Sequence, residues 1–304
     1  MSDSHAHEHG ISKPKKDYTK SFAVGVFLNL AFVLVEFIYG YVAHSMSLMS
    51  DAGHNLSDVL GLLLAWFAYS LSKKGRDKKF TYGLRSSTLL AALVNYIFLF
   101  MAVGILLWQS FDKFFHPAAV DSNIISTVAL IGIFINTATA LLFLRDRKTD
   151  LNINGAYVHM MADAAVSFAV FIGGFAIRYT NFLWIDPLLG IIVNLFIIKE
   201  GWKYFRESLF LNLHSVPEKI NLEEVEYFLK NLEFVKGVHG LHIWALSTTE
   251  TALTVHLFTP SGYPGKENLE NIQHELLEHF GIQHTTIQIE LEEIAHQCSL
   301  DNEK

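Results

Sequence analysis

The 304-residue chain is 51% hydrophobic and 17% charged, with a formal net charge of −7 at pH 7 and a mean hydropathy of +0.29. This composition is too apolar for an ordinary soluble protein and too charged for a protein lying wholly in lipid, so a membrane part joined to a soluble part is expected. The only cysteine, Cys298, excludes an intrachain disulfide and a cysteine-ligated zinc site.

Six apolar segments predict helices that cross a membrane, most of them near the ~20 residues needed to span ~30 Å of hydrocarbon. They lie at about residues 21–43, 47–71, 86–108, 123–144, 155–178 and 184–199. The last segment is short and opens with Trp184, Asp186 and Pro187, which leaves its outer end poorly defined. We therefore expect a polar tail over 1–20 and an all-α six-helix transmembrane bundle over 21–205.

The basic residues of the short loops predict how this bundle is oriented. They gather before the first segment and after the second, fourth and sixth, whereas the alternate loops carry only Lys113 and Arg178. This bias places both termini in the cytoplasm. Residues 1–20 are polar and lack a small-residue cleavage site, so no cleaved signal is expected. The compact loops favour a bacterial cell (inner) membrane.

The segment after the sixth span predicts a separate soluble module. Residues 206–296 show the order helix, strand (238–246), strand (251–259), helix, strand, which suits a small α+β domain, and 297–304 form a tail. From Glu218 onward fifteen Asp and Glu residues face five Lys. This acidic balance attracts cations and argues against binding to nucleic acid, which needs a basic surface.

Two His-x-x-x-Asp pairs, His54/Asp58 and His159/Asp163, lie within the second and fifth predicted spans. A spacing of four places both members of a pair on one helical face. Ionisable groups inside a span are costly and usually handle an ion or proton. Two imidazoles and two carboxylates make a four-coordinate set suited to zinc or a similar divalent metal. The pairs therefore predict a metal transport site.

The two pairs also agree in depth. At 1.5 Å per residue, the first pair lies ~10–16 Å below the outer face and the second ~8–14 Å above the inner face. These depths sum to about one hydrocarbon thickness, so the pairs can meet near the midplane. Asp51 shares a face with the first pair and either lines the access path or caps the outer helix end. Interhelical hydrogen bonding is expected of the other polar residues in or near the spans, which are Asn29, Glu36, Asn95, Asn136 and Asn194.

The ligand chemistry predicts coupling to protons. Metal binding requires neutral imidazoles and ionised carboxylates, so loading releases protons and protonation releases metal. We therefore expect proton-for-metal antiport by alternating access.

Several motifs together resemble the cation diffusion facilitator family. They are the run from Ser47 to Asp58, Tyr82-Gly83-Leu84-Arg85, the run from His159 to Asp163, and Asp186-Pro187. His242-Ile243-Trp244-Ala245-Leu246 and Ile287-Gln288-Ile289-Glu290 are similar to its cobalt–zinc–cadmium resistance (zinc efflux) subgroup. The resemblance covers roughly residues 18–293. It implies a proton-coupled exporter that works as a homodimer through a ferredoxin-like cytosolic domain, with His54, Asp58, His159 and Asp163 as the transport site.

The resemblance also implies a second, regulatory zinc site in the cytosolic domain, at the dimer interface. The matching positions are His239, His256, His284 and Glu290. No organic cofactor is expected; the ligands are divalent metal ions and protons, in contact with membrane lipid. His5, His7 and His9 in the N-terminal tail suit weak chelation of metal, and whether they bind it stays open.

Other functions compete with this hypothesis. A broader exporter of cobalt, cadmium and zinc uses the same ligands, and a membrane protein that binds metal or haem without transport is an alternative of a different class. Each histidine is matched with an aspartate rather than placed at haem spacing. An intramembrane metalloprotease typically carries His-Glu-x-x-His, which His54-Asn55-Leu56-Ser57-Asp58 lacks, so an enzyme is not expected.

Overall fold

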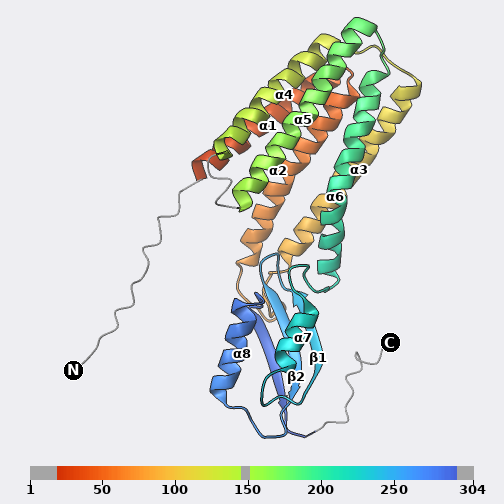
Figure 1. Ribbon diagram of the computed structural model, residues 1–304. Helices are drawn as coiled ribbons and strands as arrows, with labels where there is room; N and C mark the ends of the chain where they lie inside the picture. The colour runs from red at the N-terminus through yellow and green to blue at the C-terminus, as the bar shows by residue number, and fades with distance from the viewer. Residues whose placement is uncertain (1–18, 145–150, 293–304) are drawn as a thin grey trace, which may run out of the picture. The chain divides into compact units, whose positions relative to one another are not determined.

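The computed structural model describes residues 19–144 and 151–292. Six long helices come first, and each coincides with one of the apolar segments. Figure 1 follows them in chain order from red to green. Their bounds are α1 Thr19–Val42, α2 Met46–Ser72, α3 Ser87–Phe115, α4 Ser122–Phe143, α5 Leu151–Thr180 and α6 Ile185–Asn212.

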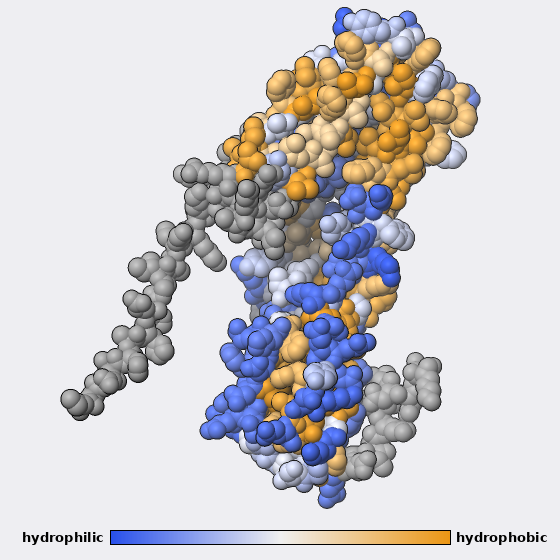
Figure 2. Space-filling view, in the orientation of Figure 1, coloured by the Kyte–Doolittle hydropathy of each residue, from blue (hydrophilic) through white to orange (hydrophobic). Residues whose placement is uncertain are grey.

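The surface of the helical part is apolar. Among the described residues, three helices are long and apolar enough to cross a membrane: Ser87–Phe115, Ser122–Leu142 and Tyr157–Thr180. Large apolar side chains such as Phe98, Trp108 and Phe134 are exposed on them. Figure 2 shows hydrophobic residues spread over these helices and hydrophilic residues over the sheet-bearing part. Such an apolar surface suits contact with lipid, because helices satisfy their own backbone hydrogen bonds there.

The sixth helix is longer than its apolar segment. It continues from Lys199, where the predicted span ends, to Asn212. The hydropathy pattern stops early because Lys199, Glu200 and Lys203 are charged, but these side chains are exposed on the continuing helix and do not interrupt its backbone. The expected boundary between residues 205 and 206 therefore falls inside α6.

Contacts divide the chain into two units, residues 1–55 with 112–190 and residues 56–111 with 191–304. The second unit carries a three-stranded sheet in the order β1-β2-β3. Its elements are α7 Leu222–Lys230, β1 Gly237–Ala245, β2 Thr251–Phe258, α8 Lys266–Glu278 and β3 His284–Glu290. This is the predicted order of helices and strands. β1 pairs with β2 antiparallel, and β2 pairs with β3 parallel.

The sheet has one covered face and one open face. Leu253, Val255 and Leu257 alternate along β2 and pack in one core with Leu229 of α7 and Leu276 of α8. Because successive strand residues point to opposite faces, His256 of β2 and Glu290 of β3 lie on the face away from the helices. The alternation of Ile287 and Ile289 with Gln288 and Glu290 predicts the same division of β3.

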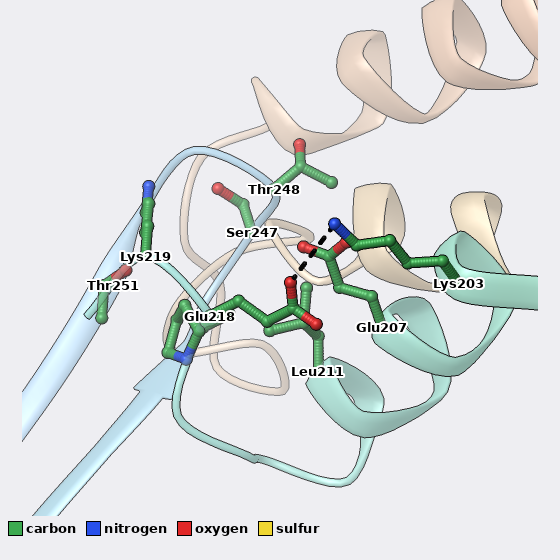
Figure 3. Close-up of a pocket in the computed structure, with 10 residues that line it drawn as sticks. Lys203, Glu207, Leu211, Glu218, Lys219, Ser247, Thr248 and Thr251 are labelled. Atoms are coloured by element: carbon green, nitrogen blue, oxygen red, sulfur yellow. Dashed lines mark ion pairs between the residues drawn. The ribbon is translucent and has the colours of Figure 1, made fainter. Parts of the chain in front are cut away.

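Polar contacts join this sheet to the long helices of the second unit. Arg85, just before α3, forms an ion pair with Glu250 in the turn between β1 and β2. The backbone N–H of Thr248 in that turn donates to Thr88 Oγ1 at 3.1 Å. Figure 3 shows a neighbouring cavity of about 420 Å³, where Lys203 of α6 lies 3.8 Å from Glu218. This cavity contains no histidine or cysteine among its lining residues, so it is not a candidate zinc site.

In the first unit α4 packs along α5, and α1 packs along α4. A glycine makes the closest approach possible. A Cβ on Gly174 of α5 would lie 2.6 Å from Ser126 Oγ and 3.1 Å from the Ser126 backbone nitrogen on α4. Small residues at such crossings let helix backbones approach closely in lipid.

Asp186, in the first turn of α6, fixes the start of α2. Its Oδ2 accepts a 2.6 Å hydrogen bond from the Met46 backbone N–H. Its Oδ1 accepts from the hydroxyls of Ser45 and Ser47, both at 2.6 Å. The carboxylate therefore satisfies donors at the helix N-terminus, where no helical acceptor exists. Asp186 is buried, and so are the three residues that supply these donors, Ser45, Met46 and Ser47.

We expect Asp186→Ala to destabilise the protein by about 2–4 kcal/mol, because it leaves several buried donors without an acceptor. Asp121 offers a matched control, since it caps α4 through the N–H groups of Asn123 and Ile124 in an exposed setting. Asp121→Ala should cost only about 1 kcal/mol. Thermal unfolding of the purified proteins in detergent measures both, and an Asp186→Ala protein as stable as the parent would contradict this role.

Candidate metal centres

The first candidate metal centre lies in the first unit, between α2 and α5. His54 of α2 and His159 of α5 both face the carboxylate of Asp163. Asp163 Oδ1 lies 3.7 Å from His54 Nε2, and Oδ2 lies 3.6 Å from His159 Nε2. Two atoms bound tetrahedrally to one zinc at ~2.0–2.1 Å lie ~3.3 Å apart. A small movement therefore brings these atoms to a shared ion.

Burial distinguishes the three side chains. Asp163 is 3% exposed, His54 19% and His159 43%. The candidate ligand atoms all lie within 4.8 Å of one another, and the two rings meet edge-on with centroids 5.9 Å apart. A buried carboxylate next to two imidazoles favours a cation, and the more exposed His159 leaves the group open on one side. The three side chains offer donor atoms of the kinds that bind a divalent metal.

The fourth predicted ligand is Asp58, on the same helix as His54. Asp58 lies on α2 one turn beyond His54, but it belongs to the second unit.

Asp51 lies deeper in its helix than a cap would. α2 begins at Met46, and Asp186 accepts from the N-terminal donors, so Asp51 does not cap the helix. Instead it is buried and accepts a hydrogen bond from Ser167 Oγ of α5 at 3.2 Å. Ser167 was not predicted as a site residue. Its spacing of four from Asp163 is the signal that would have found it.

The second candidate centre lies on the open face of the cytosolic sheet. Glu290 Oε2 lies 2.8 Å from His239 Nε2, and Glu290 Oε1 lies 2.8 Å from His256 Nδ1. The two rings have centroids 4.9 Å apart. Glu290 is 4% exposed, whereas the histidines are about one third exposed at 34% and 33%. One residue from each strand thus offers a ligand atom to the same point.

A β-bulge brings His239 into this group. His239 pairs with His256 across β1 and β2, and the register shifts between His239 and His242. Gly240 has a φ of +58° within this bulge, a value that suits glycine. The sequence did not predict to which face of the sheet His239 points, because side chains stop alternating between faces at a bulge.

Two opposing effects act on Glu290. Burial tends to raise the pKa of its carboxyl group, but the hydrogen bonds from His256 and His239 outweigh it, so the pKa lies below the ordinary value of 4.5. Gln288 Nε2 also donates to Glu290 Oε1 at 3.1 Å. The group is therefore an ionised acceptor at neutral pH, ready to ligate a metal.

His284 does not join this group. It pairs with Ala252 at the opposite end of β3 from Glu290, and its ring lies against Tyr82 with centroids 5.6 Å apart. Six residues along a strand separate the two ends by ~20 Å. The tail histidines His5, His7 and His9 lie outside the described residues, as does Cys298.

Known proteins are similar to this chain over nearly its whole length. Residues 22–211 match the family model "Cation efflux transmembrane domain", and 217–292 match "Cation efflux protein, cytoplasmic domain". The chain belongs to the cation efflux family. It is therefore an integral membrane transporter of metal cations and not an enzyme.

Individual relatives named as metal transporters are similar to this chain over most of its length. The cation efflux protein described here is 31% identical to the metal cation efflux system protein CzcD of Cupriavidus metallidurans, over 96% of this chain and 91% of the relative. It is 30% identical to a cadmium, cobalt and zinc/H(+)-K(+) antiporter of Bacillus subtilis, over 97% and 94%. It is 28% identical to the zinc transporter ZitB of Escherichia coli, over 94% and 92%.

We expect His256→Ala to remove about one bound zinc ion per chain of the purified full-length protein, because it takes away a ligand beside Glu290. His284→Ala is the matched control, since its histidine lies at the other end of β3 and should leave the metal content unchanged. Equilibrium dialysis with elemental analysis measures both variants. Equal metal loss from both would contradict the assignment of the cytosolic ligands.

Proposed function

We propose that this protein exports divalent metal cations, with zinc preferred, from the cytoplasm in exchange for protons. The single observation that carries the proposal is the Asp163 carboxylate lying 3.7 and 3.6 Å from imidazole nitrogens on two different helices. Ligands from α2 and α5 allow a relative movement of the helices to assemble or open the site. Such a movement suits alternating access.

Asp58 completes the proposed site as a fourth ligand. It follows His54 by four residues, as Asp163 follows His159, so each helix would supply one imidazole and one carboxylate. The set has a formal charge of −2 with neutral histidines, which balances one divalent ion. Zinc favours this four-coordinate mixture of nitrogen and oxygen ligands. The relatives named for zinc, cobalt and cadmium support metal transport of this class.

Proton coupling follows from the same ligands. Metal entering from the cytosol would displace protons from the histidines and carboxylates, and an outward-facing site would be reprotonated and emptied. The relative in Bacillus subtilis is named as an antiporter that uses protons and potassium, which supports exchange. A carrier rather than a channel is favoured because four ligands bind tightly, whereas conduction needs weak sites.

The remaining parts of the molecule fit this function. We propose six membrane spans over residues 21–205, both termini in the cytoplasm and a location in a bacterial inner membrane. Residues 206–296 would form a ferredoxin-like cytosolic domain through which two copies dimerise. Metal held by His239, His256 and Glu290 would then act as a regulatory ligand that reports cytosolic zinc.

We expect Asp163→Ala to abolish zinc uptake into proteoliposomes in which the cytosolic side of the protein faces outward. The initial rate should fall at least about 100-fold, because the substitution removes the buried anion of the site. Asp112→Ala is the control, since this aspartate is 66% exposed on α3, where it lies 3.4 Å from His116. Cadmium, cobalt and manganese measured in parallel define the metal preference. Equal zinc flux through Asp163→Ala and the parent would contradict the proposed transport site.

A further inference from the structure

Two carboxyl groups outside the proposed set of metal ligands are buried together in the first unit. Glu36 of α1 is 0% exposed and Asp51 of α2 is 1% exposed. Their side chains contact each other directly. No lysine or arginine of the described residues forms an ion pair with either, so the pair has no basic side chain to balance its charge.

The hydrogen bonds of this pair leave one oxygen without a donor. Asn55 Nδ2 donates to Glu36 Oε2 at 3.3 Å and to Asp51 Oδ1 at 3.4 Å. Ser167 Oγ donates to Asp51 Oδ2 at 3.2 Å. Glu36 Oε1 is fully buried and finds no donor among the described residues. A proton on Glu36 would supply the missing donor, since a protonated carboxyl carries an O–H group.

Electrostatics favours the same conclusion. Two ionised carboxylates in contact and shielded from water repel each other strongly, so a pair of this kind retains a cation between them. The titratable groups that interact with the pair are Asp163 of α5 and His54 of α2. The helix α4, which packs against α1, has no titratable side chain between Ser122 and Phe143.

We propose that Glu36 and Asp51 form a second cation site, distinct from the metal ligands, that holds one proton when the transport site is empty and releases it when metal binds. In the empty state the Glu36 O–H donates to Asp51. On loading, the O–H bond breaks, the proton leaves to the aqueous side to which the site is open, and both carboxylates remain ionised. The inference rests on the proposed transport function and adds a coupling proton that is not bound to a metal ligand.

The surrounding contacts give this site a physical link to metal. Asn55, which bonds both carboxyl groups, is the residue after His54, and Ser167 lies one helical turn from Asp163. A divalent ion at the transport site adds two positive charges near the pair. These charges favour its ionised form, because Coulomb interactions are strong where water is excluded. Metal and proton would therefore compete without sharing a ligand.

The test compares protons moved per zinc ion in proteoliposomes that contain the parent or Glu36→Gln. Internal dyes sensitive to zinc and to pH report the ratio. We expect Glu36→Gln to bind zinc within a few-fold of the parent affinity while moving about one proton fewer per zinc. Glu200→Gln makes the same chemical change at an exposed position of α6 and should leave the ratio unchanged.

Two further variants keep the result interpretable. Glu36→Asp retains a carboxyl group and should keep more of the coupling than Glu36→Gln does. Asp51→Asn should lower the ratio as Glu36→Gln does, and it provides the measurement if Glu36→Gln does not fold. An unchanged ratio in folded Glu36→Gln overturns the proposal. A second result also overturns it: zinc flux through the parent depends on potassium or sodium at fixed pH, and flux through Glu36→Gln does not. The site would then hold an alkali ion.

Failure of the proposed function has a different signature. If the parent moves no zinc at all, calorimetry of zinc binding in buffers of different ionisation heats still counts the protons released. A release that falls by about one in Glu36→Gln would then support the proton site without transport. An equal release from both proteins would overturn it.

Discussion

The proposed function depends on one buried carboxylate that lies between two imidazoles. Asp163 is 3% exposed, and its two oxygens face His54 of α2 and His159 of α5. A negative charge at this position in a membrane is unfavourable unless a cation or proton accompanies it. In the proposed function this requirement makes the two helices a binding site, because one ion can be shared by all three side chains.

Residues around this site hold its ligands in position. Asp186 holds the start of α2 through backbone and hydroxyl donors, which fixes where His54 lies along the helix. Gly174 lets α5 approach α4 closely, which fixes the helix that carries His159 and Asp163. Rigid placement matters because a displacement of about 1 Å in a ligand atom disrupts metal coordination. The family motifs Ser47 to Asp58 and Asp186-Pro187 thus combine ligands with the residues that position them.

Much of the fold was predictable because it follows from periodicity. The six apolar segments coincide with six helices, and the alternation of Ile287, Ile289 and Leu291 predicted a strand with Glu290 on its polar face. The two His-x-x-x-Asp pairs predicted the approach of α2 and α5, and the structure brings together three of those four residues. These patterns are local, and a chain encodes local geometry directly.

The features that the sequence did not predict depend on long-range contacts or on exposure. The apolar segment at 184–199 predicted a membrane span, and α6 continues beyond it to Asn212, because hydropathy detects lipid contact and not helical backbone. His284 entered the cytosolic set by resemblance, and within one chain it lies at the opposite end of β3 from Glu290. Glu36 was expected to hydrogen-bond between helices, and it accepts from Asn55 of α2. Its contact with Asp51 also joins two helices, and no spacing rule predicts that contact.

The most direct test of the central claim is zinc K-edge X-ray absorption on the full-length protein carrying His239→Ala and His256→Ala. These two substitutions remove the cytosolic ligands, so one bound zinc reports the membrane site alone. We predict four nitrogen or oxygen ligands at about 2.0–2.1 Å with the scattering of two imidazoles, and loss of that spectrum in Asp163→Ala. A six-coordinate oxygen shell without imidazole would contradict the convergence of His54, His159 and Asp163 on one ion.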